Sequence, residues 1–375
     1  MQTRQHTLRT TLLSGLLTLS LFGMTTMHNV ANAATYMPDE TSLHEATWLQ
    51  WPHHYTYGTS YRSRLDATWV AMTQALVHSE KVRIVAYNDT EKKRIQNLLA
   101  LAGVPQGNIS FMLSKTNDVW VRDNGPIFVF DQNQQLTITD WGFNGWGGDT
   151  PYTLDDTIPV TAAQQLGLPR IDLNKVILEG GAFEVDGKGT FMATRSSILE
   201  PKRNPNLTQA SLEQTLATRL GVRKFIWLDG APGGKEDITD THIDGFARFG
   251  TPDTLVTLSA TDLQYWGLSS SDINRLTTAS DADGVRYAQV KLPLTAKPVV
   301  TAYGKNLGYK GSYVNYYVGN SVVLVPEYKD ANDRVAKDIL QSLYPTRSIV
   351  GIDVRNLYAN GGMVHCVTQQ QPFAY

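Results

Sequence analysis

Short runs of β-branched and aromatic residues recur along the chain, separated by polar and glycine-containing segments. Such runs are typical of strands; they are KVRIVAY, GPIFVFD, KVILEGG, GTFMATR, KFIWLDG, DTLVTLS, SVVLVPEY and SIVGIDV. Between several of them, apolar residues recur at positions i, i+3 and i+4, which predicts helices over 63–79, 211–221 and 330–344. Strands that alternate with helices indicate an α/β fold.

Two pairs of segments resemble each other closely enough to predict a repeated strand–helix–strand unit. The helix over 330–344 leads into SIVGIDV much as the helix over 211–221 leads into KFIWLDG. Two strands also end in similar acidic and glycine-containing turns, LEGGAFEVDG and WLDGAPGG. The similarity predicts a repeat, although it does not give the number of units.

The first 33 residues have the pattern of a cleavable secretory signal. Arg4 and Arg9 precede the apolar stretch LLSGLLTLSLFGM, and the small residues Ala31-Asn32-Ala33 follow it. The apolar stretch falls short of the roughly 18 residues that a membrane span needs, and no later stretch reaches that length. We therefore expect an exported protein, periplasmic or secreted, with a signal over 1–33 and the mature chain over 34–375.

Composition predicts an ordinary globular body. Charged residues make up 18% of the chain and hydrophobic residues 42%, and the formal net charge is −2. No basic surface or long charge run favours a nucleic-acid partner, and we expect no membrane partner after signal cleavage. Length alone would allow two domains, but no flexible linker divides the chain.

The chain has a single cysteine, Cys366, which follows a glycine pair and a histidine. In an exported protein it has no partner for an internal disulfide. It is therefore either a small packed hydrophobe, the usual case for an isolated cysteine, or a reactive thiol.

Unusual polar residues gather where predicted strands meet loops. Asp123 lies in NDVWVRDNGP and Glu179 follows the apolar run of VILEGGAF. His242 and Asp244 are two residues apart in DTHIDGFARF, so an extended backbone would place both side chains on one face. In an extended GGMVHC, His365 and Cys366 would face opposite ways, which favours His242 as the partner of Cys366.

Each of these features also has a structural explanation. Asp123 could form a surface ion pair with Arg122, and Glu179 could end a strand as a solvated charge. His242 and Asp244 could form a structural hydrogen bond or bind a metal. Trp120 could be a core residue. The triplet Gln369-Gln370-Gln371 could be an exposed turn.

Taken together, the residues predict a site for a planar cation. Two carboxylates can each accept paired N–H bonds from a guanidinium group, whereas attack on a peptide bond needs donors for its oxyanion. A thiol nucleophile and a histidine beside such a cation indicate attack of sulfur on a guanidino carbon.

The chain resembles the agmatine deiminases and the related Porphyromonas-type peptidylarginine deiminases, members of the guanidino-group-modifying enzymes. The matching motifs run in the family's order from about residue 36 to the end: NDVWVRDNGP, DWGFNGWGG, VILEGGAFEVDG, RNPNLT, DTHIDGFARF, DANDRVAKDILQSLYP and GGMVHCVTQQQP. One departure is Met363-Val364 where the family commonly has glycine and asparagine before the His-Cys pair.

The resemblance implies one α/β propeller of five pseudo-symmetric ββαβ-type units around an acidic cleft, in place of two domains. It implies Cys366 as nucleophile, His242 as general acid and base, and Asp123 and Asp244 as guanidinium ligands. It further implies that Glu179 orients His242. Trp120 would line the site, and no metal or organic cofactor is expected.

The expected substrate is agmatine, converted to N-carbamoylputrescine and ammonia. Enzymes that bind a C-terminal arginine are understood to place arginines in the segment that corresponds to DWGFNGWGGDTPYTLDD, and here this segment has no Arg or Lys. It offers Trp146 and the acids Asp149, Asp155 and Asp156, which suit the ammonium group of agmatine. PKRNP could still supply a cation.

Three other functions are considered beside agmatine deimination. A peptidylarginine deiminase would use the same chemistry on peptide arginine. An exported, non-catalytic polyamine-binding protein would need the acids and Trp120 but not the thiol. A papain-like hydrolase would place cysteine before histidine, whereas here His242 precedes Cys366.

Overall fold

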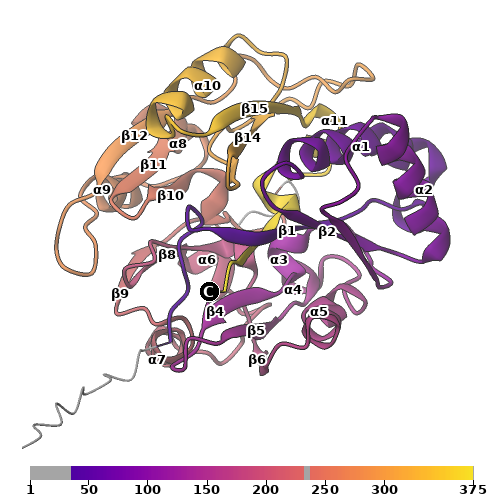
Figure 1. The fold of residues 1–375 in the computed structure, drawn as a ribbon. Helices are drawn as coiled ribbons and strands as arrows, with labels where there is room; N and C mark the ends of the chain where they lie inside the picture. Colours follow the sequence, from indigo (N-terminus) through magenta and orange to yellow (C-terminus); the bar gives the residue numbers. More distant parts are fainter. Residues whose placement is uncertain (1–34, 232–236, 375) are drawn as a thin grey trace, which may run out of the picture. The chain divides into compact units, whose positions relative to one another are not determined.

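Five small sheets surround a common centre in the computed structural model, which describes residues 35–231 and 237–374 (Figure 1). This arrangement confirms the predicted five-bladed α/β propeller. Sheet by sheet, the strands are β16 (Gln369–Pro372), β1 (His44–Gln50), β2 (Lys81–Ala86) and β3 (Ile109–Leu113); β4 (Ile127–Phe130), β5 (Leu136–Gly142) and β6 (Arg170–Ile177); β7 (Phe183–Val185), β8 (Thr190–Thr194) and β9 (Lys224–Leu228); β10 (Ala247–Thr251), β11 (Thr254–Leu258) and β12 (Ala288–Leu292); and β13 (Tyr317–Val318), β14 (Val322–Glu327) and β15 (Ser348–Asp353).

In the four-stranded sheet, β1, β2 and β3 are parallel and β16 is antiparallel to β1. The four three-stranded sheets repeat one topology. The first strand pairs antiparallel with the middle strand, and the third strand pairs parallel with the middle strand after a crossover. A parallel neighbour requires such a crossover, and here it contains a helix. The longer helices are α1 (His54–Leu76), α2 (Asp89–Leu101), α5 (Ile158–Leu166), α7 (Gln209–Leu220), α8 (Ala260–Tyr265), α9 (Ser270–Thr277) and α10 (Asn332–Leu343).

Burial falls from the centre of each blade to its rim. The first and middle strands are almost wholly buried, whereas the third strands β6, β12 and β15 are largely half-buried or exposed. A strand buried on both faces is a continuous apolar run, and for this reason the sequence predicted the middle strands β8, β11 and β14. The predicted run KVILEGG only overlaps the end of β6, which stops at Ile177.

The repeat suggested by the sequence is present in the structure. Helix α7 leads into β9 and helix α10 into β15, so the two segments are equivalent parts of two blades. Helix α7 begins where Thr208 accepts a hydrogen bond from the Ser211 N–H, and it buries leucines one turn apart on one face. It ends at Gly221, where φ is +73° and a Cβ would lie 1.9 Å from the Thr35 carbonyl oxygen.

The two ends of the described chain meet in one sheet. Strand β16 pairs antiparallel with β1, with Trp48 opposite Gln369 and Thr47 opposite Gln370. The glutamine triplet is therefore a buried strand and not the exposed turn that its polarity allowed, because its amides have buried partners. Gln371, for example, accepts from the Trp48 indole N–H at 3.2 Å.

No helix in the described ranges is both long and apolar enough to cross a membrane. The predicted signal over 1–33 lies outside the described residues. The signal and the boundary of the deiminase domain at 34–375 therefore stay predictions.

Candidate active site

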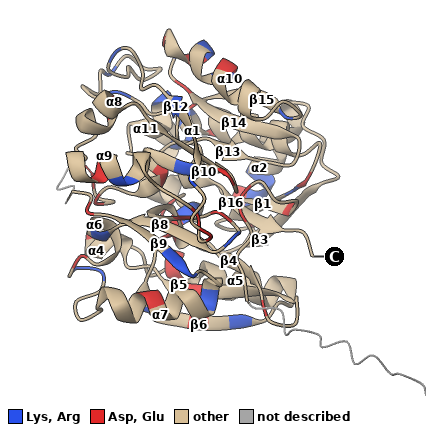
Figure 2. Ribbon diagram, turned by 90° about the vertical axis from the view of Figure 1, so that its left-hand side faces the viewer, with Lys and Arg blue, Asp and Glu red and all other residues tan. Residues whose placement is uncertain are grey.

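Short turns that enter the first strands of the blades converge at the centre of the propeller. They are α3 (Val121–Asn124) before β4, η2 (Gly180–Ala182) before β7, η3 (Ile243–Gly245) before β10 and η4 (His365–Val367) before β16. Asn315 occupies the corresponding place before β13. Turn α3 contacts η2 and η4, and η2 contacts η3. Figure 2 shows acidic positions on the loops near β8, β10 and β16.

Cys366 lies in η4 and keeps partial solvent exposure. Its Sγ is 3.3 Å from Asn315 Nδ2 and 3.9 Å from Asp244 Oδ2. The turn is helical, so the expectation of an extended GGMVHC segment was wrong. As a result, His365 and Cys366 both reach Asp244, with His365 Nδ1 at 2.7 Å from Oδ2.

His242 is held between two carboxylates. Its Nε2 lies 3.0 Å from Glu179 Oε2, and its Nδ1 lies 3.7 Å from Asp123 Oδ1. Glu179 is fully buried, and Arg203 Nε donates to both of its oxygens, at 2.7 and 2.9 Å. Glu179 is therefore not a solvated strand end, and it fixes one ring nitrogen of His242 so that Nδ1 faces Asp123.

Gly181 marks the point where three polar side chains meet. A Cβ on Gly181 would lie 2.7 Å from Asp123 Oδ1, 2.8 Å from His242 Nδ1 and 3.1 Å from Asp244 Oδ2. Its N–H also donates to Asp123 at 3.1 Å. His242 and Asp244 are brought together by the turn at Ile243–Gly245 and not by the extended backbone that the sequence suggested.

The sequence model of the family described as Porphyromonas-type peptidyl-arginine deiminase matches residues 36–372 of this chain. The chain belongs to this family.

Relatives with curated names agree with this assignment. The agmatine deiminase of Pseudomonas fluorescens (strain SBW25) is 32% identical over 372 residues, which cover 93% of this chain and 99% of that protein. The agmatine deiminase of Pseudomonas aeruginosa (strain LESB58) is 32% identical over 358 residues, covering 90% and 95%. The solved agmatine deiminase of Enterococcus faecalis is 29% identical with a TM-score of 0.79, and the match covers 91% of this chain and 97% of that one.

Two tryptophans, Trp120 and Trp146, lie beside the converging turns. Their rings meet edge to face, with centroids 6.5 Å apart, and both residues are buried. The Trp146 indole N–H donates to Asp123 Oδ2 at 3.0 Å. A Cβ on Gly362 would lie 2.1 Å from the Trp120 ring, so this glycine allows the loop before Cys366 to pack on Trp120.

The ionisation of His242 and Asp123 follows from their surroundings. Burial lowers the pKa of His242, but the charge of Asp123 and the hydrogen bond to Glu179 raise the pKa to about 9. Burial raises the pKa of Asp123 to about 6, although the nearby His242 lowers it. At neutral pH, His242 is therefore a buried imidazolium that can donate a proton.

The pKa values of Cys366 and Asp244 shift in opposite directions. Burial raises the pKa of Cys366 well above its usual value, and the charges of Asp244 and Asp123 raise it further. Burial also raises the pKa of Asp244, but the hydrogen bond and charge of His365 hold it below its ordinary value. The free protein therefore has a neutral thiol beside an ionised aspartate.

Sequence reasoning missed Asn315 and Arg203. Asn315 Nδ2 contacts Cys366, and its Oδ1 accepts from the His365 N–H at 2.9 Å. Arg203 Nη1 lies 2.6 Å from Asp240, so this arginine joins two loops behind Glu179. The position of Asn315 before the first strand of its blade would have pointed to it, had the repeat been aligned strand by strand.

The acidic segment after Trp146 differs from the expectation. Asp155 is buried and accepts the N–H groups of residues 117 and 118, and Asp156 accepts the Phe143 N–H at 2.8 Å. Both carboxylates therefore satisfy backbone donors. Of the three acids, only Asp149 has a cation close by, with Lys202 Nζ at 3.9 Å. Lys202 itself packs on Gly147.

Within residues 35–231 and 237–374, no group of three or more His, Cys, Asp or Glu side chains is arranged to hold a metal ion. The absence of a metal and of an organic cofactor stays a prediction.

Proposed function

We propose that this protein is an agmatine deiminase, which hydrolyses agmatine to N-carbamoylputrescine and ammonia. The observation that carries the proposal is the convergence of His242, Asp123 and Asp244 around Gly181, with Cys366 beside Asp244. The relatives named agmatine deiminase, at 32% identity, support the choice of substrate. A solved cysteine-to-serine variant of the C. jejuni agmatine deiminase, 25% identical with a TM-score of 0.76, has substrate bound.

Asp123 and Asp244 are the proposed ligands of the guanidinium group. Carboxylates bind a guanidinium through paired, charge-assisted hydrogen bonds, and these two face each other across Gly181. Trp146 holds Asp123 through its indole N–H, and Trp120 packs behind the loop that carries Cys366. In this proposal the two tryptophans shape the site, and the two aspartates bind the cation.

Substrate binding prepares the nucleophile. Asp244 and Asp123 disfavour the Cys366 thiolate in the free protein. A guanidinium bound between them neutralises their charge and adds a cation near sulfur, and both effects lower the pKa of the thiol. The thiol proton leaves to solvent because His242 is already protonated.

In the first half-reaction, the Cys366 thiolate forms a bond from sulfur to the guanidino carbon. His242 gives its Nδ1 proton to the departing nitrogen, and the C–N bond breaks to release ammonia. This step leaves a covalent thiouronium on sulfur and a neutral His242. Glu179 holds Nε2, so Nδ1 is the atom that loses the proton.

In the second half-reaction, neutral His242 takes a proton from water, and the oxygen bonds to the same carbon. Collapse of this adduct breaks the C–S bond and restores the Cys366 thiolate, and the remaining hydroxyl proton leaves to solvent as the C=O bond of the ureido product forms. One histidine is thus acid first and base second.

The direct test is ammonia release by the purified protein with agmatine, free arginine and a peptide that ends in arginine. We expect the highest kcat/KM for agmatine and a cysteine-bound adduct in acid-quenched samples analysed by mass spectrometry. A protein that binds agmatine without releasing ammonia would instead be a polyamine-binding protein. In that case Cys366→Ser would leave its function unchanged.

A second candidate is a peptidylarginine deiminase, and one observation favours it. Lys202 packs beside Gly147 in the loop of Trp146, where a cation could meet a peptide carboxylate. Its charge is shared with Asp149 at 3.9 Å, which weakens that role. If Lys202→Met lowers kcat/KM for the peptide and leaves agmatine unchanged, Lys202 is the carboxylate ligand. Peptide turnover equal to that of agmatine would overturn the substrate assignment.

Export is the remaining part of the proposal, and it is based on the sequence of residues 1–33. Expression with and without these residues, followed by cell fractionation and N-terminal sequencing, tests it. We expect the mature chain to begin near Ala34 outside the cytoplasm. Recovery of uncleaved protein in the cytoplasm would contradict export.

A further inference from the structure

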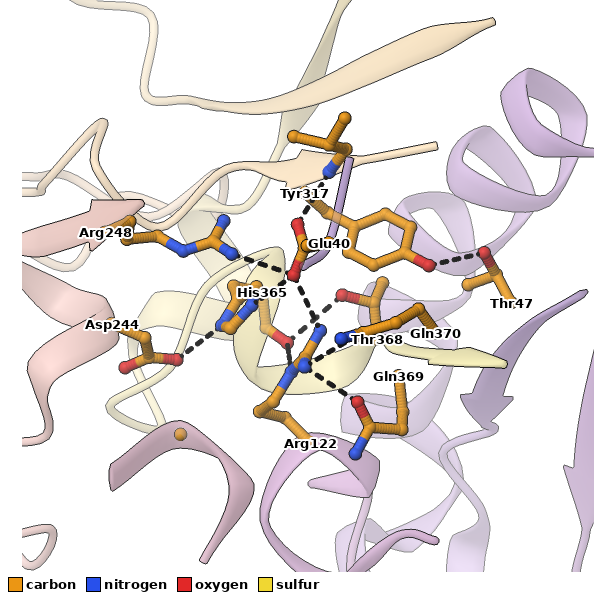
Figure 3. A network of polar contacts seen from close by, with 12 residues as sticks. Glu40, Thr47, Arg122, Asp244, Arg248, Tyr317, His365, Thr368, Gln369 and Gln370 are labelled. Carbon is orange, nitrogen blue, oxygen red and sulfur yellow. Dashed lines mark hydrogen bonds and ion pairs between the residues drawn. The ribbon is translucent and has the colours of Figure 1, made fainter. Parts of the chain in front are cut away.

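A single buried carboxylate, Glu40, accepts donors from several blades of the propeller (Figure 3). Its Oε2 lies 2.8 Å from Arg248 Nη2, 2.8 Å from His365 Nε2 and 3.3 Å from Arg122 Nη2. Its Oε1 accepts the Val318 N–H at 2.9 Å. None of these contacts takes part in the proposed reaction.

Both ring nitrogens of His365 face carboxylates. Nδ1 lies 2.7 Å from Asp244 Oδ2, and Nε2 lies 2.8 Å from Glu40 Oε2. A neutral imidazole has one N–H and one lone pair, so one of these contacts would place a lone pair against a carboxylate oxygen. A doubly protonated ring would donate one N–H to each carboxylate at these distances.

A charged His365 would balance the charges around it when all three neighbouring carboxylates are ionised. The buried groups that surround it are the carboxylates of Asp244, Glu40 and Glu184 and the guanidinium groups of Arg122 and Arg248. Glu184 Oε1 lies 4.0 Å from His365 Nε2, and the Arg122 Nε–H donates to the His365 carbonyl at 3.3 Å. Uncompensated buried charge is costly, so the third cation stabilises the arrangement.

His365 distinguishes the two proposed substrate ligands. It holds Oδ2 of Asp244 and keeps that carboxylate charged in the free protein. Asp123 lacks a contact to His365 and is paired with His242 and Trp146. Asp244 is therefore the carboxylate that is charged and oriented before the substrate arrives.

We propose that His365 is a positioning residue for the deiminase reaction: fixed between Glu40 and Asp244, it keeps Asp244 ionised and oriented toward the guanidinium of the substrate. The inference rests on the proposed function because it assigns Asp244 to the substrate. It goes further by extending the machinery to Glu40, which is remote from the reacting atoms. Glu40 contacts His365, and His365 in turn contacts Asp244.

Kinetics of Glu40→Gln and His365→Gln test this relay. Each variant removes one charge from the pair at nearly constant volume, and we expect kcat/KM for agmatine to fall about 10- to 100-fold, mostly through KM. The double variant should be no worse than His365→Gln alone, because Glu40 acts through His365. Additive losses, or stability losses with unchanged KM, would overturn the proposal.

Glu80→Gln is the matched control. Glu80 is also buried, but its contacts are with His44, whose Nδ1 lies 3.6 Å from Glu80 Oε1, and with Thr47 and Asn320, and not with Asp244 or His365. We expect this variant to lower the melting temperature and to leave KM for agmatine unchanged. An equal rise of KM in Glu80→Gln would show that the effect is general loss of packing, and would refute the assignment to His365.

The charge of His365 is read independently of turnover by ¹⁵N NMR of histidine-labelled protein, with the His365 signals assigned by their loss in His365→Gln. We expect both ring nitrogens to have imidazolium shifts at pH 8, and Glu40→Gln to move them toward the neutral form. A neutral ring in the wild type refutes the inference. Absence of ammonia release from agmatine refutes the proposed function. Failure of the inference about His365 and failure of the proposed function are therefore detected by different measurements.

Discussion

Glu179 Oε2 lies 3.0 Å from His242 Nε2, and the ring is thereby turned so that Nδ1 faces Asp123. Arg203 donates to both oxygens of Glu179, so the carboxylate is fixed from the other side. The ring of His242, the proposed proton-transfer group, is therefore oriented by residues from two separate loops. Kinetics and thermal melts of Glu179 variants separate this orienting role from an effect on the stability of the fold.

Glu179→Gln should reduce kcat for agmatine by about 10²- to 10⁴-fold, because the amide can no longer hold a charged His242 in one orientation. Steady-state kinetics with a thermal melt of the same sample measures both effects. Glu80→Gln is again the control, since it removes a buried carboxylate away from His242. Equal kinetic losses in the two variants would contradict the orienting role.

Cys366→Ser and His242→Ala should each lower turnover about 10³-fold or more while the protein stays folded, since each removes a reacting group. Ammonia release and circular dichroism of the purified variants give the two readouts. A folded Cys366→Ser variant with normal turnover would contradict a mechanism in which the thiol is the nucleophile.

Activity should fall as the pH rises past about 9, because His242 then loses the proton that it donates to ammonia. The raised pKa also predicts a change in stability. The unfolded pKa of histidine is about 6.5, so protonated His242 stabilises the fold fully below that pH, and this contribution is lost as the pH rises to about 9. Asp123→Asn removes the largest influence that raises the pKa, so the alkaline limb of the residual activity should move to lower pH. If the alkaline limb stays at the same pH in Asp123→Asn, the group that titrates there is not His242.

Gly181→Ala should lower kcat/KM about 10²-fold, because the added methyl group would displace Asp123, His242 and Asp244, which lie 2.7 to 3.1 Å from it. We expect a stability cost of about 1–3 kcal/mol from overpacking. Gly107→Ala is the control, since a Cβ there meets no atom within 4 Å. Activity retained by a folded Gly181→Ala variant would remove Gly181 from the site.

The sequence predicted what depends on local pattern. Buried middle strands such as β14 are continuous apolar runs, and the helices α7 and α10 have clear apolar faces. The site residues were named from their clustering at strand ends and from the family resemblance, and in the structure Cys366 lies beside Asp244, and His242 lies between Glu179 and Asp123.

What the sequence could not show depends on long-range contacts. Strand β16 consists of three glutamines and a proline, and its glutamine amides can be buried because Arg122 and Trp48, far away in sequence, donate to their oxygens. The helical turn at Cys366 was read as extended because a three-residue turn has no periodicity of its own. Likewise, Glu40 appears in the sequence as an ordinary acid close to the N-terminal end of the described residues.

The pairing of β16 with β1 makes the nucleophile one of the last parts to be put in place. Cys366 directly precedes β16, and this strand docks on residues about three hundred positions earlier in the chain. Contacts of such sequence separation form late in folding. During synthesis, the chain therefore has its acids and His242 well before Cys366, and loss of the residues from Cys366 onward would leave a nearly complete propeller without its proposed nucleophile.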